Sequence, residues 1–139
     1  VMKSKTELLT ELHNRRTAVT IGLIGIAAVH IADLPAKWDE TRYMAWMYIG
    51  AIAASAFLID RLVVKTSKRD YLASSLLSAS VFLGYVVNRS VGMPGAKGDI
   101  GNWFEPLGFL SLFIEVFAVW HSFHAYRTIR YLESHPEKK

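Results

Sequence analysis

The sequence predicts an all-α integral membrane protein, an antiparallel up-and-down bundle of four transmembrane helices preceded by a short amphipathic N-terminal helix. Apolar residues make up 52% of the 139-residue chain, and its mean hydropathy of +0.23 is above that of average soluble domains. Charged residues lie in blocks at the ends of apolar runs. Each apolar run has about the 20 residues that cross a bilayer.

A chain of this length is expected to form one integral membrane domain over residues 1–139. We expect the spans at residues 17–34, 43–64, 71–90 and 104–126. Proline, charges or glycines occupy the linkers between these runs, as is typical of breaks between helices. Because the linkers are short, consecutive helices must run antiparallel.

The segment from Met2 to Arg16 is polar, with three leucines on one side. Ser4 and Glu7 have the spacing of a capping box, so we expect a short helix lying on the membrane surface. A basic segment before an apolar run is also typical of a signal peptide. No convincing cleavage site follows, which favours an uncleaved first span.

Lysine and arginine predict the orientation in the membrane. The amino-terminal segment, the linker 60–70 and the carboxyl tail carry four each, whereas the other two linkers share four. Basic residues gather on the cytoplasmic side, so both termini are expected in the cytoplasm, with the chain in the plasma membrane of a prokaryote. This topology accounts for the net charge of +4, and we expect no nucleic-acid partner.

Small residues recur at helical spacing in every span, for example Gly22 with Gly25 and Gly50 with Ala54. Such residues let helix backbones approach closely in lipid. Packing within the chain is sufficient to explain them. Contact with other integral membrane subunits, or self-association, is the alternative.

Glu115 is the one charge near the middle of the fourth apolar run, about 16 Å from either end. A charge at this depth costs roughly 2.5 kcal/mol or more, so it should face the bundle interior, be paired or be protonated. Gly108, Ser111 and Ser122 share one helical face with Glu115. We therefore expect Glu115 on the closely packed side of its helix.

His30 lies about 7 Å from the middle of the first span, on the outer side. Side chains lean toward the amino terminus of their own helix, so His30 and Glu115 converge in antiparallel helices. Tyr85 in the third span lies at a similar height. The sequence thus predicts a polar site in the outer half of the bundle, with Asp33, Glu105 and Arg89 at its mouth.

Arg89 differs from Glu115 in depth by about 13 Å, so Glu105 or Asp99 is its better partner. The polar site has three interpretations. It binds a divalent metal ion through His30 and Glu115, with Asp33 and Glu105 as further ligands; it relays a proton; or it is a hydrogen-bonded network that fixes helix register. The network is favoured, because one histidine and one carboxylate form an incomplete metal shell.

His121 and His124 lie three residues apart near the inner end of the fourth span, among aromatic residues. We interpret them as part of an interfacial aromatic belt. His30 is expected on the opposite side of the membrane, which disfavours a haem shared between these residues. The glycine-rich segment 91–103 is interpreted as a tight hairpin that closes the bundle, with a docking surface as the alternative.

The chain resembles a group of small four-span bacterial membrane proteins, many of them actinobacterial. The resemblance is carried by His30 in AAVHIADLP, by NRSVGMPG from Asn88, and by NWFEPLG from Asn102 followed by Glu115. It implies the four-span fold. The first outer linker, AKWDETR, is poorer in histidine and glutamate than those of such proteins.

No complete catalytic set occurs in the sequence, so catalytic activity is not expected. The leading hypothesis is a small integral membrane subunit that packs against other membrane proteins, as an accessory part of a respiratory or oxygenase-type complex. The alternative is a metal-binding or proton-relaying protein that uses His30 and Glu115. A third hypothesis is a small transporter that works as an oligomer.

Overall fold

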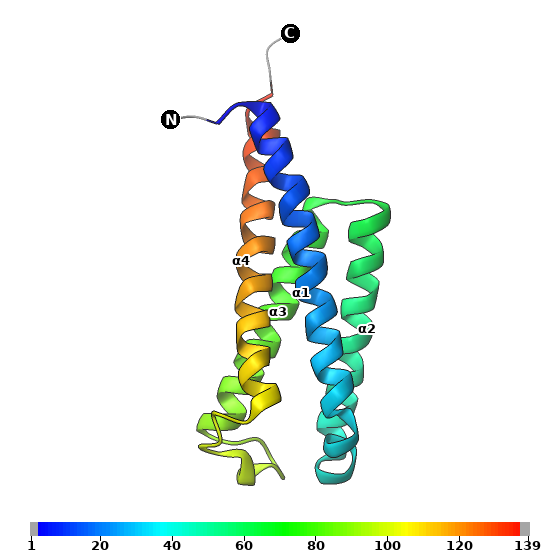
Figure 1. The fold of residues 1–139 in the computed structure, drawn as a ribbon, viewed down its shortest axis with the longest axis vertical. Coiled ribbons are helices and arrows are strands. Elements are labelled where there is room, and N and C mark those ends of the chain that lie inside the picture. Colours follow the sequence, from blue (N-terminus) through cyan, green and yellow to red (C-terminus); the bar gives the residue numbers. More distant parts are fainter. Residues whose placement is uncertain (1–2, 137–139) are drawn as a thin grey trace.

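The computed structural model describes residues 3–136, most of which lie in four long helices (Figure 1). These are α1 (Lys5–Glu40), α2 (Arg42–Val64), α3 (Lys68–Ser90) and α4 (Pro106–Ser134), with a short 3-10 helix, η1 (Lys97–Asp99), before α4. All four long helices are apolar enough to cross a membrane. The predicted all-α, antiparallel four-helix bundle is confirmed.

The predicted break between an amphipathic helix and the first span is wrong, because α1 is one continuous helix of 36 residues. Ser4 caps it as expected: Glu7 N donates to Ser4 Oγ and Ser4 N donates to the Glu7 carboxylate. Leu12 packs against the buried core. This contact continues the inward stripe of α1 and holds its first turns in line with the bundle.

The first linker is Thr41 alone, shorter than the gap between the predicted spans 17–34 and 43–64, because α1 continues through Pro35 to Glu40. A proline removes one helical hydrogen bond, and the other hydrogen bonds of the helix remain. α4 also extends eight residues beyond its predicted span, to Ser134. α1 and α4 therefore project together beyond the other two helices (Figure 1).

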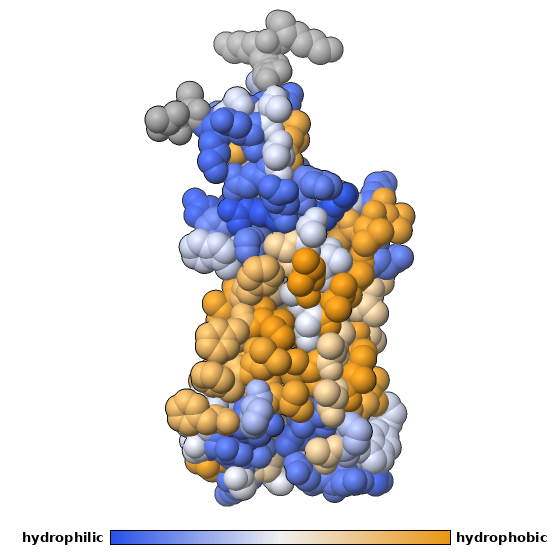
Figure 2. Space-filling model, viewed as in Figure 1, coloured by the Kyte–Doolittle hydropathy of each residue, from blue (hydrophilic) through white to orange (hydrophobic). Residues whose placement is uncertain are grey.

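The outer surface has the pattern of a membrane protein. Figure 2 shows an apolar band around the middle of the bundle, with polar residues at both ends. Large apolar side chains such as Phe57, Phe113 and Leu76 are mostly exposed on it. The protein is therefore a small multi-pass membrane protein.

The helices form a ring with one weak side. α1 packs against α2 and α4, and α3 packs closely against α4 but only lightly against α2. The linker 65–67 joins α2 to α3 at what we call the termini end, where the chain begins and finishes. Toward the opposite end, the loop end, formed by residues 91–105 and the α1–α2 turn, the pair α1–α2 diverges from the pair α3–α4 (Figure 1).

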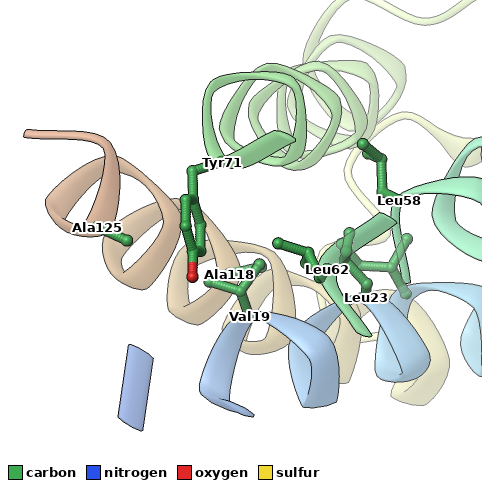
Figure 3. Close-up of a cluster of buried hydrophobic side chains, with 8 residues drawn as sticks. Val19, Leu23, Leu58, Leu62, Tyr71, Ala118 and Ala125 are labelled. Atoms are coloured by element: carbon green, nitrogen blue, oxygen red, sulfur yellow. The ribbon is translucent and has the colours of Figure 1, made fainter. Parts of the chain in front are cut away.

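The apolar core lies in the termini half of the bundle (Figure 3). Its buried members are Val19, Leu23, Ile26, Leu58, Leu62, Tyr71, Ala118 and Ala125. Gly22 brings α1 against α4, since a Cβ there would lie 2.9 Å from the Cβ of Ala118. Small side chains let the helices pack closely in this half, as expected for helix packing in lipid.

Candidate functional site: a cavity in the loop half of the bundle

A cavity of about 280 Å³ lies among the four long helices in the loop half. Its lining includes the six residues that the sequence predicts for the polar site and its mouth: His30, Asp33, Tyr85, Arg89, Glu105 and Glu115. Asp99 lies beside the cavity and forms an ion pair with Arg89. The six residues come from the first, third and fourth predicted spans, and Met44 and Tyr48 add the second span to the lining.

Glu115 lies in the cavity wall contributed by α4, and its side chain is 0% exposed. The hydroxyl of Ser111, one turn earlier, donates to Oε1, whereas Oε2 has no hydrogen-bond partner within residues 3–136. Ser111, Glu115 and Ser122 are all buried, so this face of α4 points inward as predicted. The cavity thus has an unpaired carboxyl oxygen near the depth of the membrane centre.

His30 is buried on α1, and its Nδ1 lies 2.7 Å from the carbonyl oxygen of Ile26. A carbonyl only accepts, so Nδ1 carries the hydrogen and Nε2 is left as an acceptor when the ring is neutral. The edge of the His30 ring contacts Tyr48, with centroids 4.6 Å apart. Tyr48 in turn donates its hydroxyl hydrogen to Asp33 Oδ2 at 3.0 Å.

The charged residues at the loop end pair with one another. Arg89 is 5% exposed, and its guanidinium lies 2.9 Å from Asp99 Oδ1 and 3.6 Å from Glu105 Oε2. Both partners are those that the sequence predicts for Arg89. Lys37 lies 2.8 Å from Glu40 and 3.5 Å from Asp99.

Asp99 is the common partner of these groups. Asn88 Nδ2 donates to its Oδ2 at 2.9 Å, while Lys37 and Arg89 approach the same carboxylate. Partial burial favours the neutral acid, but the Asn88 hydrogen bond and the two positive charges outweigh it and hold the pKa of Asp99 below its usual 3.8. The carboxylate is therefore ionised at neutral pH and joins α1 to α3.

Glu105 has a structural task besides its ion pair. As the N-cap of α4 it accepts hydrogen bonds from the amides of Leu107 and Gly108. Tyr85 donates to the carbonyl of Trp103 at 2.9 Å, and its ring lies 5.1 Å from the Arg89 guanidinium. Tyr85 thus ties α3 to the loop and does not bridge His30 to Glu115 through its hydroxyl.

The loop 91–105 covers the end of the bundle. Gly92 and Gly101 adopt positive φ angles, and Gly101 N donates to the Arg89 carbonyl at 2.8 Å. The hydroxyl of Tyr43 on α2 donates to the Pro94 carbonyl at 2.6 Å. These bonds form a tight hairpin across the bundle end, as the glycine pattern predicts.

The cavity opens sideways between α2 and α3. Met47 and Gly50 on α2 and Ser80 on α3 line it and are exposed. A Cβ built on Gly50 or Gly84 would meet no atom within 4 Å, unlike one on Gly22. These two glycines therefore border an opening, and packing within the chain does not account for them.

Metal binding finds no support in the arrangement. In the part of the chain that the structure describes, no three His, Asp or Glu side chains gather closely enough to hold an ion. His121 and His124 lie toward the termini end, where Nδ1 of His121 is 3.3 Å from Arg15 Nη1. Their rings contact Phe117 and Trp120, as expected of an aromatic belt.

Three polar residues of this region were not predicted: Lys37, Tyr48 and Asn88. Lys37 was placed in a linker because Pro35 resembled a helix stop. A count of helical turns inward from Tyr43 would have put Tyr48 at the height of His30.

Fold and cavity together define a small multi-pass membrane protein with a laterally open, partly charged cavity. The sequence matches no protein-family model, no curated protein and no solved structure. What the protein does must therefore be argued from the cavity itself.

Proposed function

We propose that this protein binds a small amphipathic molecule inside the membrane, in the cavity between its helices. The supporting observation is a 280 Å³ space that combines a lateral opening with an unpaired, fully buried carboxyl oxygen on Glu115. Ligand sites in helical bundles join apolar walls to a few convergent polar groups. Met44, Leu77 and Leu107 supply apolar wall here.

The position of the opening supports a ligand that arrives through lipid. The loop 91–105 covers the bundle end, whereas Gly50 and Gly84 leave the side between α2 and α3 unobstructed. An amphipathic molecule partitions into the bilayer and reaches such an opening without crossing water. Binding, and no chemical step, is the proposed role.

Native mass spectrometry of the protein released from mild detergent tests the proposal. The wild type is expected to carry a bound small molecule. Gly84→Leu, which places a side chain in the opening, is expected to lose it. Ala73→Leu adds the same side chain on an exposed position of α3 outside the cavity and should retain it. Equal occupancy of the two variants would contradict the proposal.

A second candidate is the accessory or structural subunit of a larger respiratory or oxygenase-type membrane complex. Gly50 and Gly84 favour it as well, because unpacked small residues accept a helix of another protein closely. The chain has no cysteine, so Gly84→Cys provides a single crosslinking site. A crosslink to a larger subunit, with comigration after gentle extraction, is the expected result. Migration as an uncrosslinked single chain would exclude it.

The same cavity is compatible with a proton relay through His30 and Glu115. If the protein relays protons, Glu115→Gln would abolish proton movement across the membrane of liposomes that contain it.

A divalent metal at His30 and Glu115 would need further ligands, for which Asp33 and Glu105 are the candidates. Metal quantification on the purified protein tests it. The small-transporter hypothesis would require the bound molecule to cross the membrane through the protein.

The topology is also a proposal. Basic residues such as Arg16, Lys65 and Arg127 lie near the termini end, which we assign to the cytoplasm of a prokaryotic plasma membrane. Lys138 and Lys139, which the sequence argument also counts, lie outside the described residues. Labelling of single cysteines at each end from outside intact cells checks this orientation. A kinship with four-span bacterial membrane proteins, likewise a proposal, would support a prokaryotic plasma membrane.

A further inference from the structure

The charges around the cavity indicate which class of molecule it binds. We propose that the ligand is a lipophilic organic cation, a protonated amine with an apolar body, whose N–H group donates to Glu115. This inference rests on the proposed binding function and names its ligand class.

The first argument is the balance of charge. Both basic side chains of the lining are already paired: Arg89 with Asp99 and Glu105, and Lys37 with Glu40 and Asp99. Within residues 3–136, no ion pair reaches the other two carboxyl groups of the lining, Asp33 and Glu115. Among the described residues, both basic side chains of the lining therefore have carboxylate partners, whereas two of its carboxyl groups have no basic partner.

The second argument is the kind of hydrogen bond that the cavity lacks. Within residues 3–136, Glu115 Oε2 and Asn88 Oδ1 are buried acceptors without a donor, and Arg89 Nε is a buried donor of the lining without an acceptor. His30 Nε2 is a further acceptor in the neutral ring. An ammonium group supplies three donors and no acceptor, so it complements this set, whereas a carboxylate ligand would add to the excess of acceptors.

The third argument concerns the surroundings of Glu115. An ionised carboxyl group near the membrane centre is costly unless a positive charge lies beside it. Met44, Leu77 and Leu107 give the remaining wall an apolar character that suits a hydrocarbon body. The aromatic ring of Tyr48 also lines the cavity, and aromatic rings attract cations. A compact hydrated metal ion would match none of this apolar surface.

Three probes share a 2-phenylethyl body and differ in the charge of the head group: 2-phenylethylammonium, the neutral n-propylbenzene and the anionic 3-phenylpropanoate. Binding is measured by calorimetry on the full chain in nanodiscs of zwitterionic lipid, with empty discs as the blank. We expect the ammonium probe to bind most tightly. Glu115→Gln should weaken it at least about tenfold, because a charge-assisted hydrogen bond is lost.

Glu133→Gln is the matched control, since this carboxylate pairs with Lys68 near the end of α4, away from the cavity. It should leave the affinity for the ammonium probe unchanged. Asp33→Asn is a second carboxylate variant, to be used if Glu115→Gln does not fold, and a smaller loss of ammonium binding is expected from it. n-Propylbenzene should bind the wild type and both cavity variants alike.

The outcomes distinguish the inference from the function on which it rests. If the neutral or anionic probe binds as tightly as the ammonium, the cavity binds ligands but the cation inference is wrong. The same conclusion follows if both carboxylate variants bind the ammonium like the wild type. If none of the three probes binds and no molecule copurifies, the binding function fails together with the inference.

Discussion

The two halves of this bundle are held together in different ways. In the termini half, apolar side chains such as Leu23 and Leu62 fill the interior, and Gly22 allows α1 to touch α4. In the loop half the helices diverge, and charged groups centred on Asp99 connect them around a cavity. The difference shows that close packing stabilises one half, while the other keeps space for a ligand and relies on polar contacts.

The largest expected effect tests the polar contacts of the loop half. Arg89→Met removes a nearly buried charge from two carboxylates and should lower the free energy of unfolding by about 3 kcal/mol. Lys68→Met, in an exposed pair with Glu133, should cost less than about 1 kcal/mol. Reversible unfolding in mixed micelles measures both. Equal losses of stability in the two variants would mean that the ion pairs of Arg89 do not stabilise the loop half.

A pair of glycine substitutions compares the packing of the two halves. Gly22→Ala forces a Cβ against Ala118, whereas Gly84→Ala places one in open space. Helix propensity improves equally at both sites, so it cancels in the difference. We expect Gly22→Ala to be less stable than Gly84→Ala by about 2 kcal/mol, because an overpacked contact must shift. Similar stabilities in the same unfolding assay would show that the termini half is not closely packed.

Ser55 is a buried residue of the termini half, and its hydroxyl has no hydrogen-bond partner within the described residues. Ser55→Ala should raise the free energy of unfolding by about 1 kcal/mol, because no hydrogen bond is lost. Ser78, equally buried, donates to the Ser74 carbonyl at 2.8 Å. Ser78→Ala is the control and should give no gain. Thermal unfolding in detergent distinguishes the two variants.

The smallest effect is on the pH dependence of the loop half. The folded-state pKa of Asp99 lies below its unfolded value of 3.8, so its stabilising contribution is present above that pH. The contribution declines as the pH falls through the folded pKa and the carboxylate becomes protonated. Between about pH 5 and about pH 3 the wild type should lose more stability than Asp99→Asn. Parallel pH profiles of melting temperature would contradict this assignment.

Local periodicity accounts for what the sequence predicts correctly. The inward face of Glu115 follows from helical spacing, and the meeting of His30, Arg89 and Glu115 around one space follows from antiparallel spans with short linkers. The expectation of a helix end near Pro35 was wrong, because a proline removes only one helical hydrogen bond and α1 continues through it to Glu40.

The cavity itself could not be predicted from the sequence. Gly22 and Gly50 each lie at helical spacing from another small residue, yet Gly22 packs against Ala118 and Gly50 borders an opening. Whether a glycine packs against another helix or borders an opening depends on how far the helices diverge in the packed bundle. The place of Tyr48 in the cavity wall likewise depends on its neighbours across the bundle.

The continuity of α1 has a mechanical consequence. Its 36 residues measure about 54 Å, whereas the hydrocarbon layer is about 30 Å thick. The surplus, roughly 20 Å, stands at the termini end beside the last turns of α4 as a stiff paired stalk (Figure 1). With no hinge between stalk and membrane segment, a tilt of α1 within the bilayer swings the tip of the stalk.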